Sequence, residues 1–196
     1  MPNLKKLTAV EPDTDQMAGL KTRVAQLLPD VRTEFHQETA ESWQGGDERF
    51  DAVLLFHCLY YVPLSQRPVL YKKLFDKIVA DGGLVFILTT PCDIRNPTML
   101  TQVSDLLGVP KYNLTENTDG VQISDMMAAA GFHECYQLPL GVQLNVQEPN
   151  DDLMSVFVYW SRGTLSLDQA RDAAKQVFGN LKYIPNETWF GAFQKP

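Results

Sequence analysis

The stretch from Phe50 to Pro63 constrains the fold of this chain more than any other part of the sequence. Its apolar run, from Ala52 to Phe56, lacks the alternation of polar and apolar residues that a half-exposed strand shows. Such a run is typical of a strand buried on both faces of a parallel sheet, and it predicts an α/β fold. Polar and aromatic residues follow at the edge where open α/β sheets bind their ligands, namely His57, Tyr60 and Tyr61.

Length, charge and hydropathy narrow the class of protein. The 196 residues, 44% of them hydrophobic, predict a single domain covering residues 1–196. The 24 acidic and 17 basic residues give a net charge of −7, which does not suit a nucleic-acid-binding protein. No apolar run has the length of a membrane span, and the N-terminus does not resemble a secretory signal. We therefore expect a cytoplasmic protein that binds neither nucleic acid nor membrane, and the sequence leaves its oligomeric state open.

Cysteine and histidine spacing predicts neither disulfides nor a metal site. Cys58, Cys92 and Cys135 are odd in number and far apart, which fits reduced thiols. No Cys-x-x-Cys or Cys/His spacing of a zinc site occurs.

The first part of the chain predicts a strand, a helix and a second strand. The strand from Leu4 to Val10 places Glu11 at its tip, where nucleotide-binding α/β folds hold ribose hydroxyls. Asp13 or Thr14 can cap the following helix, and Gln16 is placed to close a capping box with Asp13. The buried face of that helix is expected to consist of Met17, Leu20, Val24 and Leu27. The second strand is expected at residues 31–36, and Trp43 is expected to pack on the sheet edge.

A second strand and helix unit follows the central stretch. Ser65 or Gln66 opens a helix that Asp81-Gly82-Gly83 ends, and Leu84 to Thr89 forms the next apolar strand. The helix is expected to bury Val69, Leu70, Leu74, Ile78 and Val79.

The remaining elements are predicted with less regular signals. Ser124 caps a short helix that ends at Gly131, and a strand from Phe132 to Val146 is broken at residues 139–141. The segment Leu153–Trp160 fits helix or strand by pattern, and the acidic residues before it favour helix. The other expected elements are a helix at 97–107, a polar loop at 111–120, an amphipathic helix at 166–179 and a final strand ending at Phe193.

Several short motifs, in order along nearly the whole chain, resemble the histamine N-methyltransferase family. They are Val10-Glu11-Pro12, Gln16, His36-Gln37-Glu38-Thr39, Phe50-Asp51, Leu59-Tyr60-Tyr61-Val62, Glu134-Cys135-Tyr136 and Asn186-Glu187-Thr188. The resemblance implies a Rossmann-like class I methyltransferase sheet with helices on both faces. It also implies S-adenosyl-L-methionine as the cofactor and a small amine as the substrate.

The resemblance also implies site residues. Glu11 would hold the cofactor ribose and Gln16 a nearby part of the cofactor, while Thr39, Ala40 and Phe56 would flank the adenine. At Ala40 the family has a serine, so only backbone contact is expected there. For the acceptor amine, the implied residues are His57, Tyr60, Tyr61 and Glu187, where the family has glutamine at the first position and asparagine at the last.

The chain departs from the family at its start. No Gly-x-Gly pattern precedes Glu11, so the resemblance implies that the first strand, the Gly-rich loop and the N-terminal helices are missing. The chain is then an N-terminally truncated form of the domain.

Three functions stay open at this point. The first is methyl transfer to a ring nitrogen of a histamine-like amine, with His57 as the base that takes the released proton. The second is a related methyltransferase with another small acceptor, and the third is a non-catalytic truncated remnant. His57 is as readily interpreted as an ordinary histidine at the sheet edge.

Overall fold

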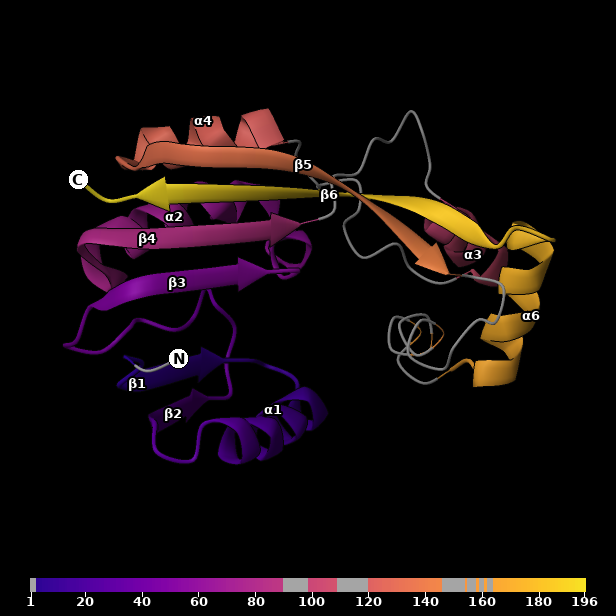
Figure 1. Ribbon diagram of the computed structural model, residues 1–196, viewed down its shortest axis with the longest axis horizontal. Helices are drawn as coiled ribbons and strands as arrows, with labels where there is room; N and C mark the ends of the chain where they lie inside the picture. The colour runs from indigo at the N-terminus through magenta and orange to yellow at the C-terminus, as the bar shows by residue number, and fades with distance from the viewer. Residues whose placement is uncertain are drawn as a thin grey trace. The chain divides into compact units, whose positions relative to one another are not determined.

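The chain folds into two compact units in the computed structural model, Met1–Glu48 and Arg49–Pro196 (Figure 1). The structure describes residues 3–89, 99–108, 120–145, 154, 158, 161 and 164–196. The expected loop at 111–120 lies outside this part of the chain except for Gly120, and the expected helix at 153–160 lies outside it except for Met154 and Val158. The single domain over residues 1–196 stays a prediction.

The first unit is the expected strand, helix and strand. β1 (Lys6–Val10) and β2 (Arg32–His36) pair in parallel, from Lys6 opposite Arg32 to Val10 opposite His36, and α1 (Thr14–Leu27) connects them. Met17 and Val24 are buried on α1, whereas Leu27 is 77% exposed. The predicted apolar stripe therefore ends one turn early.

Charged side chains join β1 and β2 across their exposed surface. The ammonium group of Lys6 contacts the carboxylates of Glu34 and Glu48, and the Arg32 guanidinium contacts the same two carboxylates. Glu48 and then Glu34 raise the pKa of Lys6, and Lys6 in turn lowers the pKa of both carboxylates. These pairs tie the segment before Arg49 to the two strands.

The second unit contains a mixed sheet in the order β3-β4-β6-β5 (Figure 1). β3 and β4 are parallel, and β6 pairs antiparallel with both of its neighbours. This arrangement, with its helices, confirms the α/β class. The elements are β3 (Phe50–Phe56), α2 (Arg67–Lys73), β4 (Val79–Thr89), α3 (Met99–Leu107), α4 (Gly120–Ala130), β5 (His133–Asn145), α6 (Leu167–Phe178) and β6 (Tyr183–Gln194).

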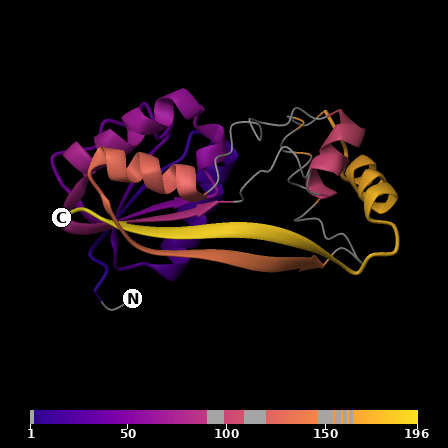
Figure 2. The same cartoon turned by 90° about the horizontal axis from the view of Figure 1, so that it is seen from above.

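Helices α2 and α4 lie on the same face of this sheet (Figure 2). Side chains on that face are buried, with Leu55 and Phe193 only 7% and 0% exposed. On the opposite face Leu54, Phe56 and Tyr136 are 59%, 45% and 53% exposed. The expectation that β3 is buried on both faces is therefore wrong for the described residues, because β3 is an edge strand with helices on one side.

The boundary between α2 and β4 also differs from the prediction. The helical segment ends at Ile78 in a π-helical turn (Leu74–Ile78), and β4 begins at Val79. Residues 81–83 form an irregularity within β4, because Phe50 pairs with Val79 whereas Ala52 pairs with Leu84. Val69, expected in the core, is 70% exposed, and Arg67 and Tyr71 occupy the buried side of the helix instead.

Lys195 holds this irregularity in place. Its backbone N–H donates to the Gly83 carbonyl (3.0 Å), and its carbonyl accepts from the Gly82 N–H (2.9 Å). Its ammonium group lies 2.9 Å from the Asp81 carboxylate, which lowers the pKa of Asp81. The two glycines therefore serve a contact with the chain's last strand, which sequence reasoning mistook for a helix stop.

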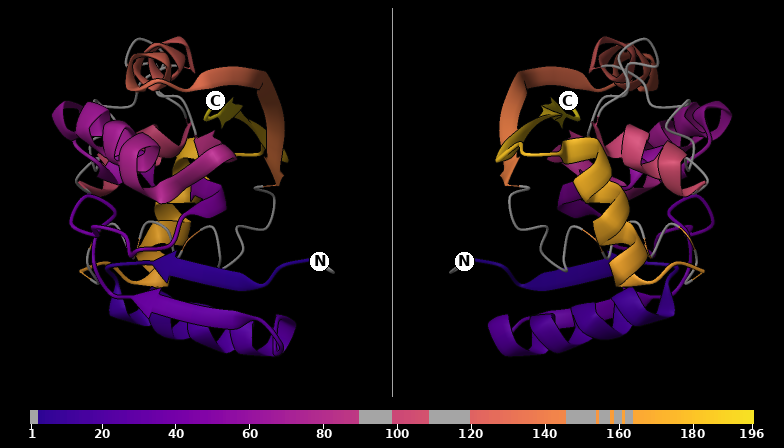
Figure 3. Two further views of the ribbon diagram at one scale, coloured as in Figure 1. Left: turned by 90° about the vertical axis from the view of Figure 1, so that its left-hand side faces the viewer. Right: turned by 90° about the vertical axis from the view of Figure 1, so that its right-hand side faces the viewer.

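Two further local predictions are corrected. α4 begins at Gly120, so Ser124 lies inside the helix rather than at its cap. β5 continues through Pro139, which pairs with Trp189, and the strand bends along its length (Figure 3). Proline is tolerated there because β5 is an edge strand, so an amide hydrogen facing away from β6 is not needed.

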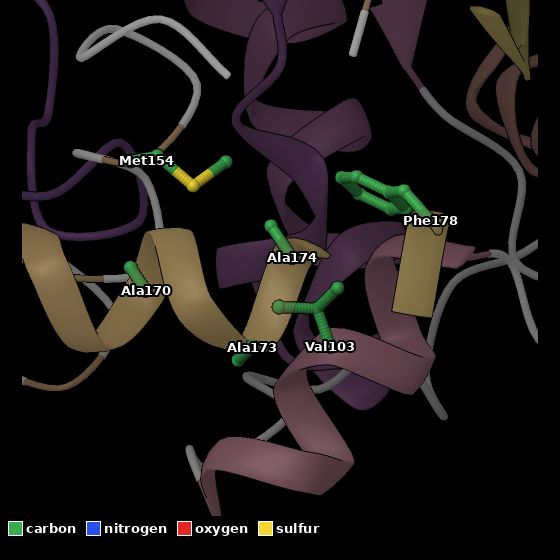
Figure 4. Close-up of a cluster of buried hydrophobic side chains, with 6 residues drawn as sticks. All are labelled: Val103, Met154, Ala170, Ala173, Ala174 and Phe178. Carbon is green, nitrogen blue, oxygen red and sulfur yellow. The ribbon is translucent and has the colours of Figure 1, made fainter. Parts of the chain in front are cut away.

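A separate apolar cluster joins α3 to α6 (Figure 4). α6 lies where the sequence predicts an amphipathic helix; Ser166 and Gln169 form a complete capping box at its start, and Gly179 follows its last residue with a φ of 58°. The three alanines on α6 leave room for Val103 of α3 to pack closely. The cluster consists of Val103, Met154, Ala170, Ala173, Ala174 and Phe178.

The exposed apolar face of the β3-β4-β6-β5 sheet predicts self-association of the chain at micromolar concentration, because contiguous apolar surface avoids water. Leu54→Lys places a charge on this face, within the edge strand β3, and should shift the chain towards monomer in sedimentation velocity. Val69→Lys is the control, since Val69 is equally exposed but lies on α2. An equal effect of both substitutions would contradict the role of the sheet face.

Candidate functional site

Glu11 lies at the carboxyl end of β1, as predicted. Its backbone N–H donates to the His36 carbonyl (3.1 Å), which continues the parallel pairing past the strands. Its carboxylate accepts a hydrogen bond from the Asp13 N–H (2.9 Å). In the predicted capping box the side chain of Gln16 would have accepted this bond, so Glu11 takes the place of Gln16. Asp13 still caps α1 by accepting from the N–H groups of Asp15 and Gln16. The Glu11 carboxylate is thus oriented at this edge and keeps further acceptor capacity for hydroxyl groups.

The loop after β2 comes to the same edge. The Gln37 amide donates to the Thr14 hydroxyl (2.7 Å), which links the end of β2 to the start of α1. The Thr39 carbonyl accepts from the Trp43 N–H (3.0 Å), and the Thr39 hydroxyl accepts from the Ser42 N–H (3.2 Å). These bonds make a tight turn that contains the half-buried Ala40. The first unit therefore brings Glu11, Gln16, Thr39 and Ala40 to the carboxyl ends of β1 and β2.

The ring of Trp43 packs against the ring of His36 at this turn. The rings of His36 and Trp43 lie 5.5 Å apart and are tilted by 42°. This contact agrees with the prediction that Trp43 packs at the sheet edge.

His57 follows β3 in a strained backbone conformation. Its φ of 52° is positive, a conformation in which histidine is more frequent than most residues. Its N–H donates to the Leu88 carbonyl (2.7 Å), so the turn stays attached to β4. The side chain is exposed to solvent, yet the protein around it desolvates the imidazole and lowers the pKa of His57 below 6.5. The imidazole is therefore neutral and able to accept a proton near neutral pH.

The tyrosine pair lies in a short 3-10 helix, Leu59–Tyr61. The N–H groups of Tyr61 and Val62 close this turn on the carbonyls of Cys58 and Leu59, each at 3.0 Å. Leu59 and Val62 are buried, and Tyr61 is 41% exposed. The turn thus presents Tyr61 outward while its flanking residues anchor it. Of Tyr60 only the backbone is described.

Topology places Glu187 at the same edge as His57. Thr89, the last residue of β4, pairs with Trp189, and Glu187 lies two residues before Trp189 on β6, opposite Gly141. β4 separates β3 from β6, so the backbones of β3 and β6 are roughly 10 Å apart. The sheet therefore gathers the predicted acceptor positions at the carboxyl ends of β3 and β4. Phe56 precedes His57 and lies on the exposed face of the sheet.

Sequence reasoning missed Arg67. This arginine is 1% exposed, and its guanidinium donates to the Val62 carbonyl from Nε (3.0 Å) and to the Leu59 carbonyl from Nη2 (2.8 Å). A signal was present, because Arg67 shares the helical spacing of the buried Leu70, Tyr71 and Leu74. Tyr71 is also fully buried, and this burial raises the pKa of its phenol.

Other features of the described residues do not add to these sites. A pocket of about 240 Å³ lies at the amino end of β2, away from Glu11, and includes Lys21, Leu28 and Phe35 in its lining. No group of three or more His, Cys, Asp and Glu side chains in the described part of the chain could hold a metal ion. None of the described helices has both the length and the hydropathy to cross a membrane.

Solved structures of methyltransferases share this fold. No family model matches the sequence, and no curated protein does either. A proposed methyltransferase from Bacillus halodurans superposes with a TM-score of 0.65 at 14% identity, over 100% of this chain and 85% of the other. The N-methyltransferase NodS of Bradyrhizobium japonicum gives 0.58 at 11% identity, over 100% and 76%.

A third similar structure is a phosphoethanolamine N-methyltransferase of Haemonchus contortus, bound to phosphomonomethylethanolamine and S-adenosylhomocysteine. Its TM-score is 0.60 at 15% identity, over 98% of this chain and 44% of the other. NodS has likewise been solved with S-adenosylhomocysteine. These likenesses show that the chain has the Rossmann-like fold of class I methyltransferases, as the sequence predicts.

His57 should make stability depend on pH. Because its pKa is lowered in the folded chain, the unfolded chain takes up the proton first as the pH falls below 6.5. The free energy of unfolding should therefore fall as the pH decreases below 6.5. His57→Gln should flatten this decline in urea titrations at several pH values, and His133→Gln, on the exposed β5, serves as the control. Identical slopes for His57→Gln and the unmodified chain would contradict the assignment.

Proposed function

We propose that this chain is an S-adenosylmethionine-dependent N-methyltransferase that methylates a ring nitrogen of a small, histamine-like amine. The observation that carries the proposal is the match of the whole chain to methyltransferase structures, with a TM-score of 0.65 over 100% of its residues. N-Methyltransferases are among the neighbours. The ordered motifs from Val10 to Thr188 support the histamine type.

The residues of the first unit fit a role towards the methyl donor. A carboxylate at the end of β1 can accept hydrogen bonds from two adjacent ribose hydroxyls, and Glu11 is held there by the Asp13 N–H. Gln16, in the first turn of α1, is exposed and able to reach a polar group nearby. The Thr39 turn offers its backbone at Ala40 to the adenine. When bound, the donor supplies an activated methyl group on a sulfonium.

The residues of the second unit fit a role towards the acceptor. Methyl transfer would be a direct displacement at the donor's methyl group, so these residues would chiefly hold the acceptor nitrogen in line with it. The ring of Tyr61, and that of Tyr60, would form an aromatic wall that suits a cationic amine tail. Glu187 would pair with the charge of that tail. His57, neutral near pH 7, would accept the proton that the methylated nitrogen releases.

Binding of the donor product tests the proposal first. Glu11→Gln should weaken the binding of S-adenosylhomocysteine, measured by calorimetric titration, by roughly 10- to 100-fold, because a charged acceptor of hydroxyl hydrogen bonds is lost. Glutamine keeps an oxygen for the Asp13 N–H, so α1 should stay capped.

Asp15→Asn is the matched control for this titration, since it removes a carboxylate from the same exposed turn. Equal affinities of Glu11→Gln and the unmodified chain would remove Glu11 from the site. Absence of binding by the unmodified chain would favour the non-catalytic remnant.

His57→Gln tests the base. The substitution removes the imidazole and should lower kcat for a histamine-like acceptor by about 100-fold, because the proposed proton acceptor is lost. Methylation is followed over a panel of small amines as a function of pH. Unchanged turnover with His57→Gln would exclude His57 as the base, and turnover of a different amine class would favour the related methyltransferase.

A further inference from the structure

A buried arginine binds the turn that carries Tyr60 and Tyr61. Arg67, the first residue of α2, is 1% exposed, although an isolated guanidinium is costly to remove from water. Two of its hydrogen bonds end on Leu59 and Val62, the residues on either side of the tyrosine pair. The guanidinium therefore bridges the two ends of the turn on its buried side.

We infer that Arg67 is the positioning residue of the acceptor wall, holding the backbone at Tyr60 and Tyr61 in one geometry. A role for Arg67 in amine binding rests on the proposed function, whereas its hydrogen bonds to Leu59 and Val62 do not. Arg67 acts through the turn and is not itself placed against the substrate.

The chemistry of the side chain explains why an arginine suits this place. The guanidinium is planar and stays charged, and it donates from nitrogens in a fixed fork, so one group reaches both carbonyls. A lysine at this position could approach either carbonyl but would not fix the distance between them. Two backbone hydrogen bonds close the turn, and the Arg67 guanidinium adds a pair of charge-assisted bonds to them.

Local order supplies a readout that does not need activity. The N–H groups of Tyr61 and Val62 are bonded within the turn, so their exchange with deuterium reports its opening. Arg67→Met should speed their exchange by about 10- to 100-fold, since charge-assisted bonds to both carbonyls are lost. Exchange at Val85 and Ile87 in β4 should stay unchanged. Arg67→Lys, which keeps the charge, should fall between the two, and it replaces Arg67→Met if the latter does not fold.

Tyr71→Phe is the matched control. Tyr71 is equally buried, one turn along α2, and its hydroxyl has no hydrogen-bond partner among the described residues. Exchange at Tyr61 and Val62 should be the same in Tyr71→Phe and in the unmodified chain. Unchanged exchange in folded Arg67→Met or Arg67→Lys would overturn the inference, and so would an equal increase in Tyr71→Phe.

The catalytic meaning is tested by separating KM from kcat. Arg67→Lys should raise the KM for the amine while leaving the affinity for S-adenosylhomocysteine unchanged, because only the acceptor wall is disturbed.

Methylguanidinium added at millimolar concentration to Arg67→Ala should partly restore protection of the Tyr61 N–H from exchange, and an equal concentration of sodium chloride should not. Loss of cofactor affinity in Arg67→Lys would overturn the role in the acceptor wall. If the chain transfers no methyl group, the proposed function fails, while the exchange measurements still decide the positioning role.

Discussion

Parallel pairing of neighbouring strands is the constraint on which both candidate sites depend. Parallel strands end at the same edge of a sheet, so residues that follow them in sequence become neighbours in space. In the first unit this brings Glu11 beside the end of β2, where its N–H binds the His36 carbonyl. In the second it brings His57 beside Leu88 of β4. Substitutions that shift either register would displace the sites without touching their side chains.

The second unit shows how a turn can be ordered from both sides. On the outside, the positive φ of His57 directs the chain away from the sheet. On the inside, Arg67 joins the carbonyls on either side of the tyrosines. Backbone strain at one end and a buried charge at the other are costs that a merely structural loop would not need. Their presence together is consistent with a turn whose geometry serves binding.

Short stretches of sequence predicted the elements that are stabilised by contacts between residues near in sequence. The strand, helix and strand of the first unit follow from apolar runs and the Asp13 cap, and the amphipathic helix that starts after Ser166 appears as expected. The edge position of Glu11 and His57 was likewise predictable, because it depends only on where each strand ends. Roles for these residues towards cofactor and acceptor came from the family resemblance and stay predictions.

Contacts between distant parts of the chain account for what was missed. Gly82 and Gly83 look like a helix stop until Lys195 is seen to bind them, and Pro139 looks like a strand break until β5 is seen to be an edge. The burial of Arg67 rather than Val69 depends on the carbonyls of the preceding turn. No window of a few residues contains this information.

The place of β6 has a consequence for how the chain matures. β6 follows both β4 and β5 in sequence, yet it lies between them and pairs with both. Before β6 has left the ribosome, the edges of β4 and β5 that will bind it are unpaired, and the irregularity at residues 81–83 lacks its bonds to Lys195. The sheet of the second unit therefore closes late in synthesis, and its waiting edges are surfaces that chaperones recognise.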